Sequence, residues 1–176
     1  MSIRPAAVAD LGPLSALAAA TFPLAAPDDA TPESLAAFIE QNLSVSSFAG
    51  YLNDSNCDLL VHDDGNISGY VLLVAGEPDD LDVAAAITIR PTIMISKFYV
   101  SPDAHGQGMA AQLMTAAFEA AEVRGVSAMW LGVNQENVRA QRFYAKHGFE
   151  TVGTKRFQVG DRLEHDYVLQ RPLRSR

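Results

Sequence analysis

Apolar positions follow two spacings along this chain, one typical of amphipathic helices and one typical of strands. The helical spacing predicts five helices, at Asp10–Ala20, Thr31–Gln41, Ser44–Leu52, Gly106–Arg124 and Asn137–Gly148. Alternating or continuous apolar runs, bounded by turn residues, predict seven strands at Ile3–Pro5, Cys57–His62, Ile67–Ala75, Ile87–Val100, Ala128–Val133, Phe149–Gln158 and Leu163–Leu169. The pattern therefore predicts an α/β (α+β) fold in which a mixed central sheet of about seven strands is flanked by about four to five helices.

Turn and helix-end signals separate these elements. Thr31 followed by Pro32 is a strong helix start, and Gly125 is expected to end the long fourth helix. The run 63–66 predicts a hairpin turn and the run 76–82 a polar loop, while Pro91 marks a bend or an edge in its strand. No repeat or low-complexity linker divides the chain, so we expect a single domain over residues 1–176.

Composition and charge narrow the class of protein. The chain has 176 residues, 48% of them apolar, with 13 basic against 21 acidic side chains and a net charge of −8. Nucleic acid and anionic membranes attract basic proteins, so neither is expected as a partner. Cys57 is the only cysteine, which excludes an intramolecular disulfide and a cysteine pair for zinc. We expect a cytoplasmic protein without a metal.

The apolar run Leu14–Ala26 has some features of a secretory signal peptide. Arg4 is the only basic residue before it, and Asp10 and Pro13 interrupt the approach. No stretch reaches the roughly 18 uninterrupted apolar residues that a membrane helix needs. A buried amphipathic helix is therefore the better interpretation of this run.

A glycine-rich loop joins the strand that ends at Val100 to a long helix. Gly106 and Gly108 lack a Cβ, so the backbone there can approach a ligand closely. Together with the amides at the start of the helix, they predict a site for an anion such as pyrophosphate, with a tight turn as the alternative. Gly106, Gly108 and Ala111 also fit the dinucleotide pattern G-x-G-x-x-A. The next strand, however, ends at Asn134 without the acidic residue that a dinucleotide site requires.

A second run, 131–149, combines a strand, a polar turn and a short helix. Together the two runs resemble the GNAT superfamily of acetyl-coenzyme A-dependent N-acetyltransferases, which implies the GNAT fold. The family pattern V-x-x-x-N-x-x-A-x-x-F-Y-x-x-x-G-F is matched at Val133, Asn137, Ala140, Phe143, Tyr144, Gly148 and Phe149. Within the superfamily the chain is most similar to PaiA-like bacterial acetyltransferases, some of which act on spermidine and spermine. That narrower likeness rests on Thr21–Phe22, Trp130–Val133 and Phe157–Leu169.

The resemblance implies roles for residues in both runs. The pyrophosphate of coenzyme A would lie on the loop and first helical turn, at His105, Gly106, Gln107, Gly108, Met109, Ala110 and Ala111. The pantetheine arm would pair with the strand backbone at Phe98, Tyr99 and Val100. Asn137 would hydrogen-bond the pantetheine. Tyr144 would protonate the departing thiolate, a role suited to a phenol with a pKa near 10.

The chain departs from the family pattern at two places. His105 stands where relatives usually have Gln or Arg. Relatives often carry, on the strand before the loop, a glutamate that removes the amine proton through water, whereas Met94 and Ser96 occupy the corresponding positions here. The base is therefore unassigned. Solvent is an alternative to the candidate side chains, which are His105, Glu136, Glu164, His165 and Asp166.

These observations predict an N-acetyltransferase that moves acetyl from acetyl-coenzyme A, its cosubstrate, to a primary amine by direct attack. The expected acceptor is a small molecule or a polyamine, and the expected protein is a monomer or a homodimer. The missing strand glutamate keeps one alternative open, a catalytically silent module that binds coenzyme A as a sensor or for interaction. An intact Tyr144 argues against that alternative, because a silent module has no use for a leaving-group acid.

Overall fold

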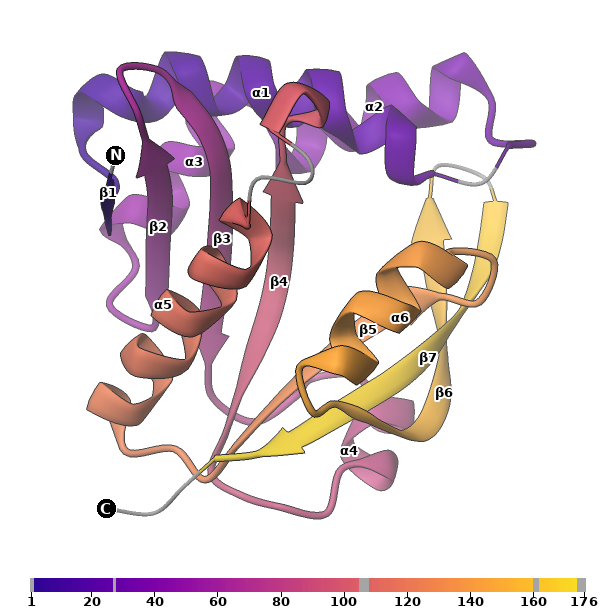
Figure 1. The fold of residues 1–176 in the computed structure, drawn as a ribbon. Helices are drawn as coiled ribbons and strands as arrows, with labels where there is room; N and C mark the ends of the chain where they lie inside the picture. Colours follow the sequence, from indigo (N-terminus) through magenta and orange to yellow (C-terminus); the bar gives the residue numbers. More distant parts are fainter. Residues whose placement is uncertain (1, 27, 105–107, 160–161, 174–176) are drawn as a thin grey trace.

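The computed structural model describes residues 2–26, 28–104, 108–159 and 162–173. Along these residues the elements are β1 (Ser2–Pro5), η1 (Val8–Asp10), α1 (Leu11–Ala25), α2 (Pro32–Asn42), α3 (Val45–Asn53), β2 (Cys57–Asp63), β3 (Ile67–Ala75), α4 (Leu81–Ala86), β4 (Thr92–Val100), η2 (Pro102–Ala104), α5 (Met109–Arg124), β5 (Ala128–Asn134), α6 (Val138–Lys146), β6 (Glu150–Val159) and β7 (Arg162–Pro172). Each predicted helix and strand has a counterpart in this order. The strands form one seven-stranded sheet in the order β1-β2-β3-β4-β5-β7-β6 (Figure 1).

The sheet opens near its centre, between β4 and β5. These two strands are parallel, whereas every other neighbouring pair is antiparallel. Their pairing covers only Thr92–Met94 against Ala128–Trp130. Beyond it the strands diverge, and Figure 1 shows the resulting V. The rest of β4 and the rest of β5 therefore stand on the two sides of an opening in the sheet.

Helices cover both faces of the sheet, as the sequence predicts. Side chains alternate along β3, so Val71 and Leu73 face one side while Tyr70 and Leu72 face the other. The first pair packs in a core with α5, and the second pair packs in a core with α1 and α3. All four side chains are fully buried. The central strands are therefore the middle layer between two helical layers.

Helix α4 is not predicted by the sequence pattern, which indicates a loop over 76–82. The Asp80 carboxylate accepts hydrogen bonds from the amides of Asp82 and Val83 and so begins the helix. Val83 is fully buried in a small third core with Trp130 of β5. With only 6 residues, α4 is too short for a helical period to stand out from the surrounding polar residues.

The strand predicted over Ile87–Val100 begins only at Thr92. The amides of Thr88 and Ile89 donate to the Oε1 atom of Gln170, at 3.0 and 3.2 Å, rather than to a neighbouring strand. Gln170 is 82 residues away from Thr88 along the chain. The β-branched composition of this stretch suits a strand, but Pro91 interrupts it directly before Thr92, and the contact with Gln170 takes up the amides of Thr88 and Ile89.

Helix α1 is longer than predicted and begins differently. It runs to Ala25 instead of ending near Ala20. Asp10 stands at the N-cap position, but its carboxylate accepts a hydrogen bond from the Ala7 amide and pairs with Arg4 at 2.8 Å instead of capping the helix. The predicted start of the helix agrees with the structure, while the Asp10 side chain bonds to residues before the helix.

One helical stretch, Val8–Ala25, is long and apolar enough to cross a membrane by length and composition. Leu14, Ala18 and Phe22 of this stretch are buried against the sheet in the same core as Phe48 of α3. A core helix passes the same test as a membrane span. The packing agrees with the buried amphipathic helix favoured by the sequence.

Candidate active site

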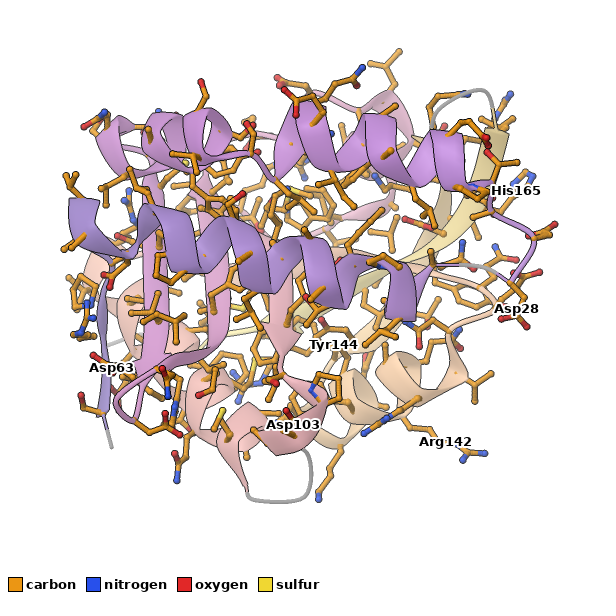
Figure 2. The ribbon with its side chains drawn as sticks, turned by 90° about the horizontal axis from the view of Figure 1, so that it is seen from above. Asp28, Asp63, Asp103, Arg142, Tyr144 and His165 are labelled. Carbon is orange, nitrogen blue, oxygen red and sulfur yellow. The ribbon has the colours of Figure 1, made fainter. Side chains whose placement is uncertain are left out.

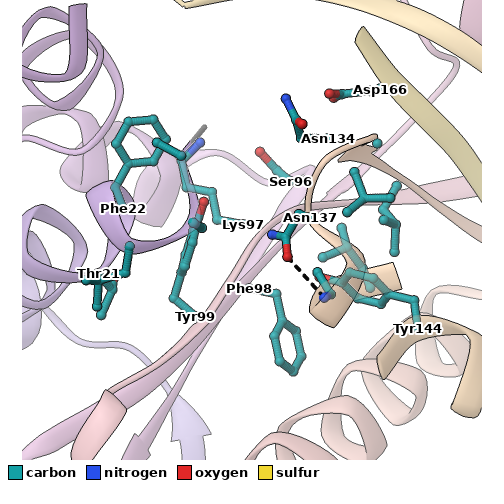
Figure 3. A pocket seen from close by; sticks show the side chains of 18 of the residues that line it. Thr21, Phe22, Ser96, Lys97, Phe98, Tyr99, Asn134, Asn137, Tyr144 and Asp166 are labelled. Atoms are coloured by element: carbon teal, nitrogen blue, oxygen red, sulfur yellow. Dashed lines mark hydrogen bonds between the residues drawn. The ribbon is translucent and has the colours of Figure 1, made fainter. Parts of the chain in front are cut away.

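The opening between β4 and β5 holds a cavity of about 400 Å³. Its lining comes from α1, α2, β4, β5, α6, β6 and β7, from the start of α5 and from segments next to these elements. Figure 3 shows Ser96 and Asp166 toward one end of the cavity and Phe22 and Lys97 toward the other. The divergence of the two strands therefore makes room for a ligand within the sheet itself.

The β4 wall of the cavity presents backbone as well as side chains. Among the strands that the structure describes, only β3 pairs with β4 from Ile95 to Tyr99. Phe98, Tyr99 and Val100, which the sequence predicts beside the pantetheine arm, all line the cavity. The N–H and C=O groups along a strand edge recur at the spacing of an extended chain. This edge therefore fits a ligand that pairs with it like an added strand.

The start of α5 lies at the same cavity, where Ala110 lines the wall. Gly108 has a φ of +75°, a left-handed conformation that suits glycine. The Gln112 amide donates to the Gly108 carbonyl, and the amides before Gln112 have no acceptor within the helix. Met109 buries its side chain in the protein, so only its backbone is available to a ligand. Three predicted residues of this loop, His105, Gly106 and Gln107, lie outside the described residues.

Helix α6 brings Asn137 and Tyr144 to the cavity. Asn137 Oδ1 accepts the Ala140 amide at 3.1 Å, the dashed line in Figure 3, so only Nδ2 remains to donate to a ligand. Tyr144 is buried edge-on to Phe98, whereas Arg142 of the same helix points outward (Figure 2). Burial raises the pKa of Tyr144, so its hydroxyl stays protonated at neutral pH and can donate a proton or a hydrogen bond.

A bulge in β4 turns two further side chains toward the cavity. Ile95 lies in the core under α5, and strict alternation would send Lys97 and Tyr99 to that same face. The pairing with β3 contains one extra residue in β4, Ser96, which reverses the alternation. Tyr99 therefore packs in the core beneath α1, while Phe98 packs on the α5 side. The sequence gives no local signal for this bulge.

Lys97 carries a charge that is largely enclosed by the protein. Its Nζ atom lies 5.4 Å from the centre of the Tyr51 ring, a cation–π contact. Burial lowers the pKa of Lys97 to about 8, because the enclosed site disfavours the charged form. No sequence motif singles out this lysine.

Of the five candidate bases, Glu164 and Asp166 line the cavity among the residues that the structure describes. Both belong to β7 and are nine-tenths or more buried. Glu136 and His165 are exposed, and His105 lies outside the described residues. Residues two apart in a strand share a face, so the spacing of the two carboxylates is a signal by which the sequence could have singled them out.

Two expectations concern metals and the single cysteine. Within the described ranges, no group of three or more His, Cys, Asp or Glu side chains could hold a metal ion. Cys57 is half-buried, and burial raises the pKa of its thiol to about 11. A thiol with so high a pKa is a poor nucleophile, which favours a structural role for Cys57.

Residues 17–149 match the model of the acetyltransferase (GNAT) family. The chain belongs to this family. An uncharacterized N-acetyltransferase of Mycobacterium tuberculosis is 46% identical over 165 residues, which cover 93% of this chain and 98% of that protein. An uncharacterized N-acetyltransferase of Lactobacillus delbrueckii subsp. lactis is 27% identical over 166 residues, covering 93% and 92% of the two chains. The family and these relatives identify the chain as an acetyl-coenzyme A-dependent N-acetyltransferase, which confirms the predicted enzyme class.

Solved structures of GNAT acetyltransferases share the fold. The PaiA N-acetyltransferase from Thermoplasma acidophilum, in complex with coenzyme A, superposes with a TM-score of 0.76 and 17% identity over 97% of this chain and 98% of its own. A ribosomal-protein-alanine N-acetyltransferase from Brucella melitensis has a TM-score of 0.66 and 22% identity, covering 98% and 100%. These likenesses confirm the predicted GNAT fold with its mixed seven-stranded sheet.

Proposed function

We propose that the chain is a single N-acetyltransferase domain that transfers acetyl from acetyl-coenzyme A to a primary amine by direct attack. The observation that carries this proposal is the parting of β4 from β5 after Met94 and Trp130, with the β4 edge and the buried Tyr144 facing one cavity. A pantetheine arm paired with β4 would bring its thioester into the space that Tyr144 lines. The coenzyme supplies the activated acetyl group.

We call the β4 edge, the start of α5 and the inner face of α6 the coenzyme wall. Its residues fit this ligand. The amides of Met109, Ala110 and Ala111 point out of the positive end of a helix of 16 residues and suit a pyrophosphate. Asn137 Nδ2 is left to donate to the pantetheine. An amide of β4 would polarise the thioester carbonyl, and such a donor contributes about 3 kcal/mol where it has been removed from other enzymes.

The transfer forms one bond and breaks one bond. The neutral amine attacks the thioester carbon, a C–N bond forms, and the C–S bond breaks. A thiolate leaves more readily when it is protonated, and the Tyr144 hydroxyl is the donor on this wall of the cavity. Burial keeps that hydroxyl protonated until the sulfur takes its proton.

We call the end of α1, the Lys97 and Tyr99 side chains and the inner face of β7 the acceptor wall. This wall holds charges of both signs. Glu164 and Asp166 suit an ammonium group, and polyamines such as spermidine and spermine are the acceptors that the PaiA-like resemblance favours. Lys97 suits an acceptor with an anionic group as well. The protein would work as a cytoplasmic monomer or homodimer, with no nucleic-acid or membrane partner.

Thiol release from acetyl-coenzyme A tests the proposal, with spermidine, spermine and a dipeptide as acceptors. Tyr144→Phe should reduce kcat by about 10²–10⁴-fold, the usual contribution of a general acid, while coenzyme A binds as before. Tyr70→Phe is the matched control, since Tyr70 is a fully buried tyrosine that does not line the cavity. It should keep the kcat of the unmodified enzyme.

Three results would contradict parts of the proposal. Unchanged turnover in Tyr144→Phe would remove Tyr144 as the acid. Coenzyme A binding without thiol release for any acceptor amine would favour the sensor alternative. Thermal stabilisation by NAD and not by acetyl-coenzyme A, each at about 100 times a micromolar dissociation constant, would show that the glycine loop serves a dinucleotide instead.

A further inference from the structure

Asp166 occupies an unusual place on the acceptor wall. It pairs across the sheet with Asn134, the last residue of β5, and its side chain is 94% buried, with a relative exposure of 6%. A Cβ placed on Gly132 would lie 3.1 Å from Asp166 Oδ2. The glycine therefore leaves room for the carboxylate to lie over the β5 backbone. Figure 3 shows Asp166 beside the cavity, at the same end as Asn134 and Ser96.

The Asp166 carboxylate is buried without the bonds that usually stabilise a buried charge. In the parts of the chain that the structure describes, no hydrogen bond is donated to it, and Lys155 is the nearby cation that favours its charged form most. A buried carboxylate without donors costs free energy in its charged form, unless a ligand supplies the proton or the cation. An acceptor ammonium that enters the cavity would supply a proton and a second cation beside Lys155.

Several titratable groups surround Asp166. Burial raises its pKa to about 6, with Lys155 on β6 and His165 on β7 lowering it and Glu164 raising it. Tyr99 on β4 faces it across the cavity, and the pKa of Tyr99 is raised to about 12 by burial and by the Asp166 charge. The neighbouring hydroxyl therefore stays neutral over the working range of a carboxylate with this pKa. A base that titrates near neutral pH is efficient at removing protons.

The other groups near the reaction are less suited to take a proton. Met94 and Ser96, at the strand positions where a base would be sought first, do not titrate near neutral pH. Glu164 Oε2 accepts a hydrogen bond from Asn134 Nδ2 at 3.4 Å, which holds this carboxylate at the end of β5. Glu136 is exposed outside the main cavity.

We propose that Asp166 is the catalytic base, which binds the acceptor ammonium and removes its proton before attack. This inference rests on the proposed function. The ammonium gives one proton to Asp166, and the neutral amine then forms the C–N bond as the C–S bond breaks. The second amine proton replaces the one that Tyr144 gives to the sulfur, and Asp166 returns its own proton to water. The base thus lies on β7 instead of β4.

The test is the pH dependence of kcat/KM for Asp166→Asn against the unmodified enzyme. The unmodified enzyme should show an acid limb near pH 6. Asp166→Asn should lose about 100-fold in kcat/KM at pH 7, a typical contribution of a general base. Its rate should then rise up to tenfold per pH unit toward the pKa of the acceptor amine, because solvent removes the proton instead. The dissociation constant of coenzyme A should stay unchanged.

Glu136→Gln is the matched control, an exposed carboxylate that should leave the profile unaltered. Asp166→Glu should restore part of the rate and the acid limb, which a purely structural role for Asp166 would not produce. If Asp166→Asn fails to fold, the acid limb of the unmodified enzyme decides alone, and a flat profile between pH 5 and 7 overturns the proposal. An unchanged profile in a folded Asp166→Asn overturns it too. If the unmodified enzyme acetylates no amine, the proposed function is wrong, and so is the assignment of Asp166 as its base.

Discussion

The coenzyme wall and the acceptor wall of the cavity differ in the kind of group that faces the ligand. On the coenzyme wall the proposed contacts come mainly from backbone groups, supplied by two short runs of the chain, 98–111 and 131–149. On the acceptor wall they come from side chains of α1, β4 and β7, which are far apart in sequence. The ring of Phe22, at the end of α1, is stacked on that of Phe38, of α2, with centroids 4.4 Å apart.

This difference explains how such an enzyme can keep coenzyme A as its cosubstrate while its acceptor amine changes. Backbone amides and a strand edge can bind a ligand beside many different side chains, so we expect the proposed coenzyme wall to tolerate neutral substitutions that leave its backbone in place. A single substitution on the acceptor wall, by contrast, changes its charge or shape. The two walls should therefore respond separately to mutation, and the following variants test that separation.

The largest expected effect comes from a matched pair of core leucines, Leu14 in α1 and Leu113 in α5. Both side chains are fully buried, on opposite faces of the sheet. Replacing either by alanine should lower the free energy of unfolding by about 2–5 kcal/mol, measured by urea titration. Leu113→Ala should also weaken coenzyme A binding, because Leu113 holds α5 in place, and Leu14→Ala should instead raise the acceptor KM. Equal effects of both variants on both ligands would contradict the separation.

The same difference explains which parts of the molecule the sequence reveals. The start of α5 and helix α6 are predicted because their signals are local. Gly108 directly precedes α5, and Asn137 directly precedes α6. The position of Tyr99 depends on the bulge at Ser96, which appears only in the pairing of β4 with β3. The amide of Thr88, before β4, is bound by Gln170, at the far end of the chain. Local patterns predict the elements and the proposed coenzyme wall, and the spacing of Glu164 and Asp166 is local too, whereas the position of Tyr99 depends on long-range pairing.

A smaller effect is expected at the start of α5. Ala110→Asp places a carboxylate where the pyrophosphate is proposed to lie, and should weaken coenzyme A binding by about tenfold, equal to about 1.4 kcal/mol. The unliganded protein should keep its melting temperature, because an acidic side chain in the first turn suits the helix dipole. Ala111→Gln, a neutral control of larger size, should bind more tightly than Ala110→Asp. Calorimetry with coenzyme A checks both, and a loss of acceptor affinity at constant coenzyme A affinity would contradict the assignment.

Lys97 on the acceptor wall should reduce stability. Its pKa falls from 10.5 to about 8 in the folded protein, so between these two pH values the unfolded chain binds more protons and stability rises with pH. Below pH 8 both states are protonated, and the full destabilisation is present. Lys97→Met should therefore raise the melting temperature at pH 7, by about 2–4 °C for each 1 kcal/mol removed, and abolish the rise above pH 8. Lys146→Met, at an exposed lysine, should change neither.

The smallest effect is expected from Gly132→Ala, at the junction of the two walls. The added Cβ would lie 2.7 Å from Lys155 Cε and 3.1 Å from Asp166 Oδ2. Lys155 can swing aside because its side chain is long, but the short Asp166 side chain must shift with it. The acceptor KM should rise about threefold, a difference of about 0.7 kcal/mol, while coenzyme A affinity stays constant. Gly12→Ala in α1, where a Cβ meets nothing within 4 Å, should leave both constants unchanged. If Gly132→Ala changed only the affinity for coenzyme A, Gly132 and Asp166 would have to be assigned to the coenzyme wall instead.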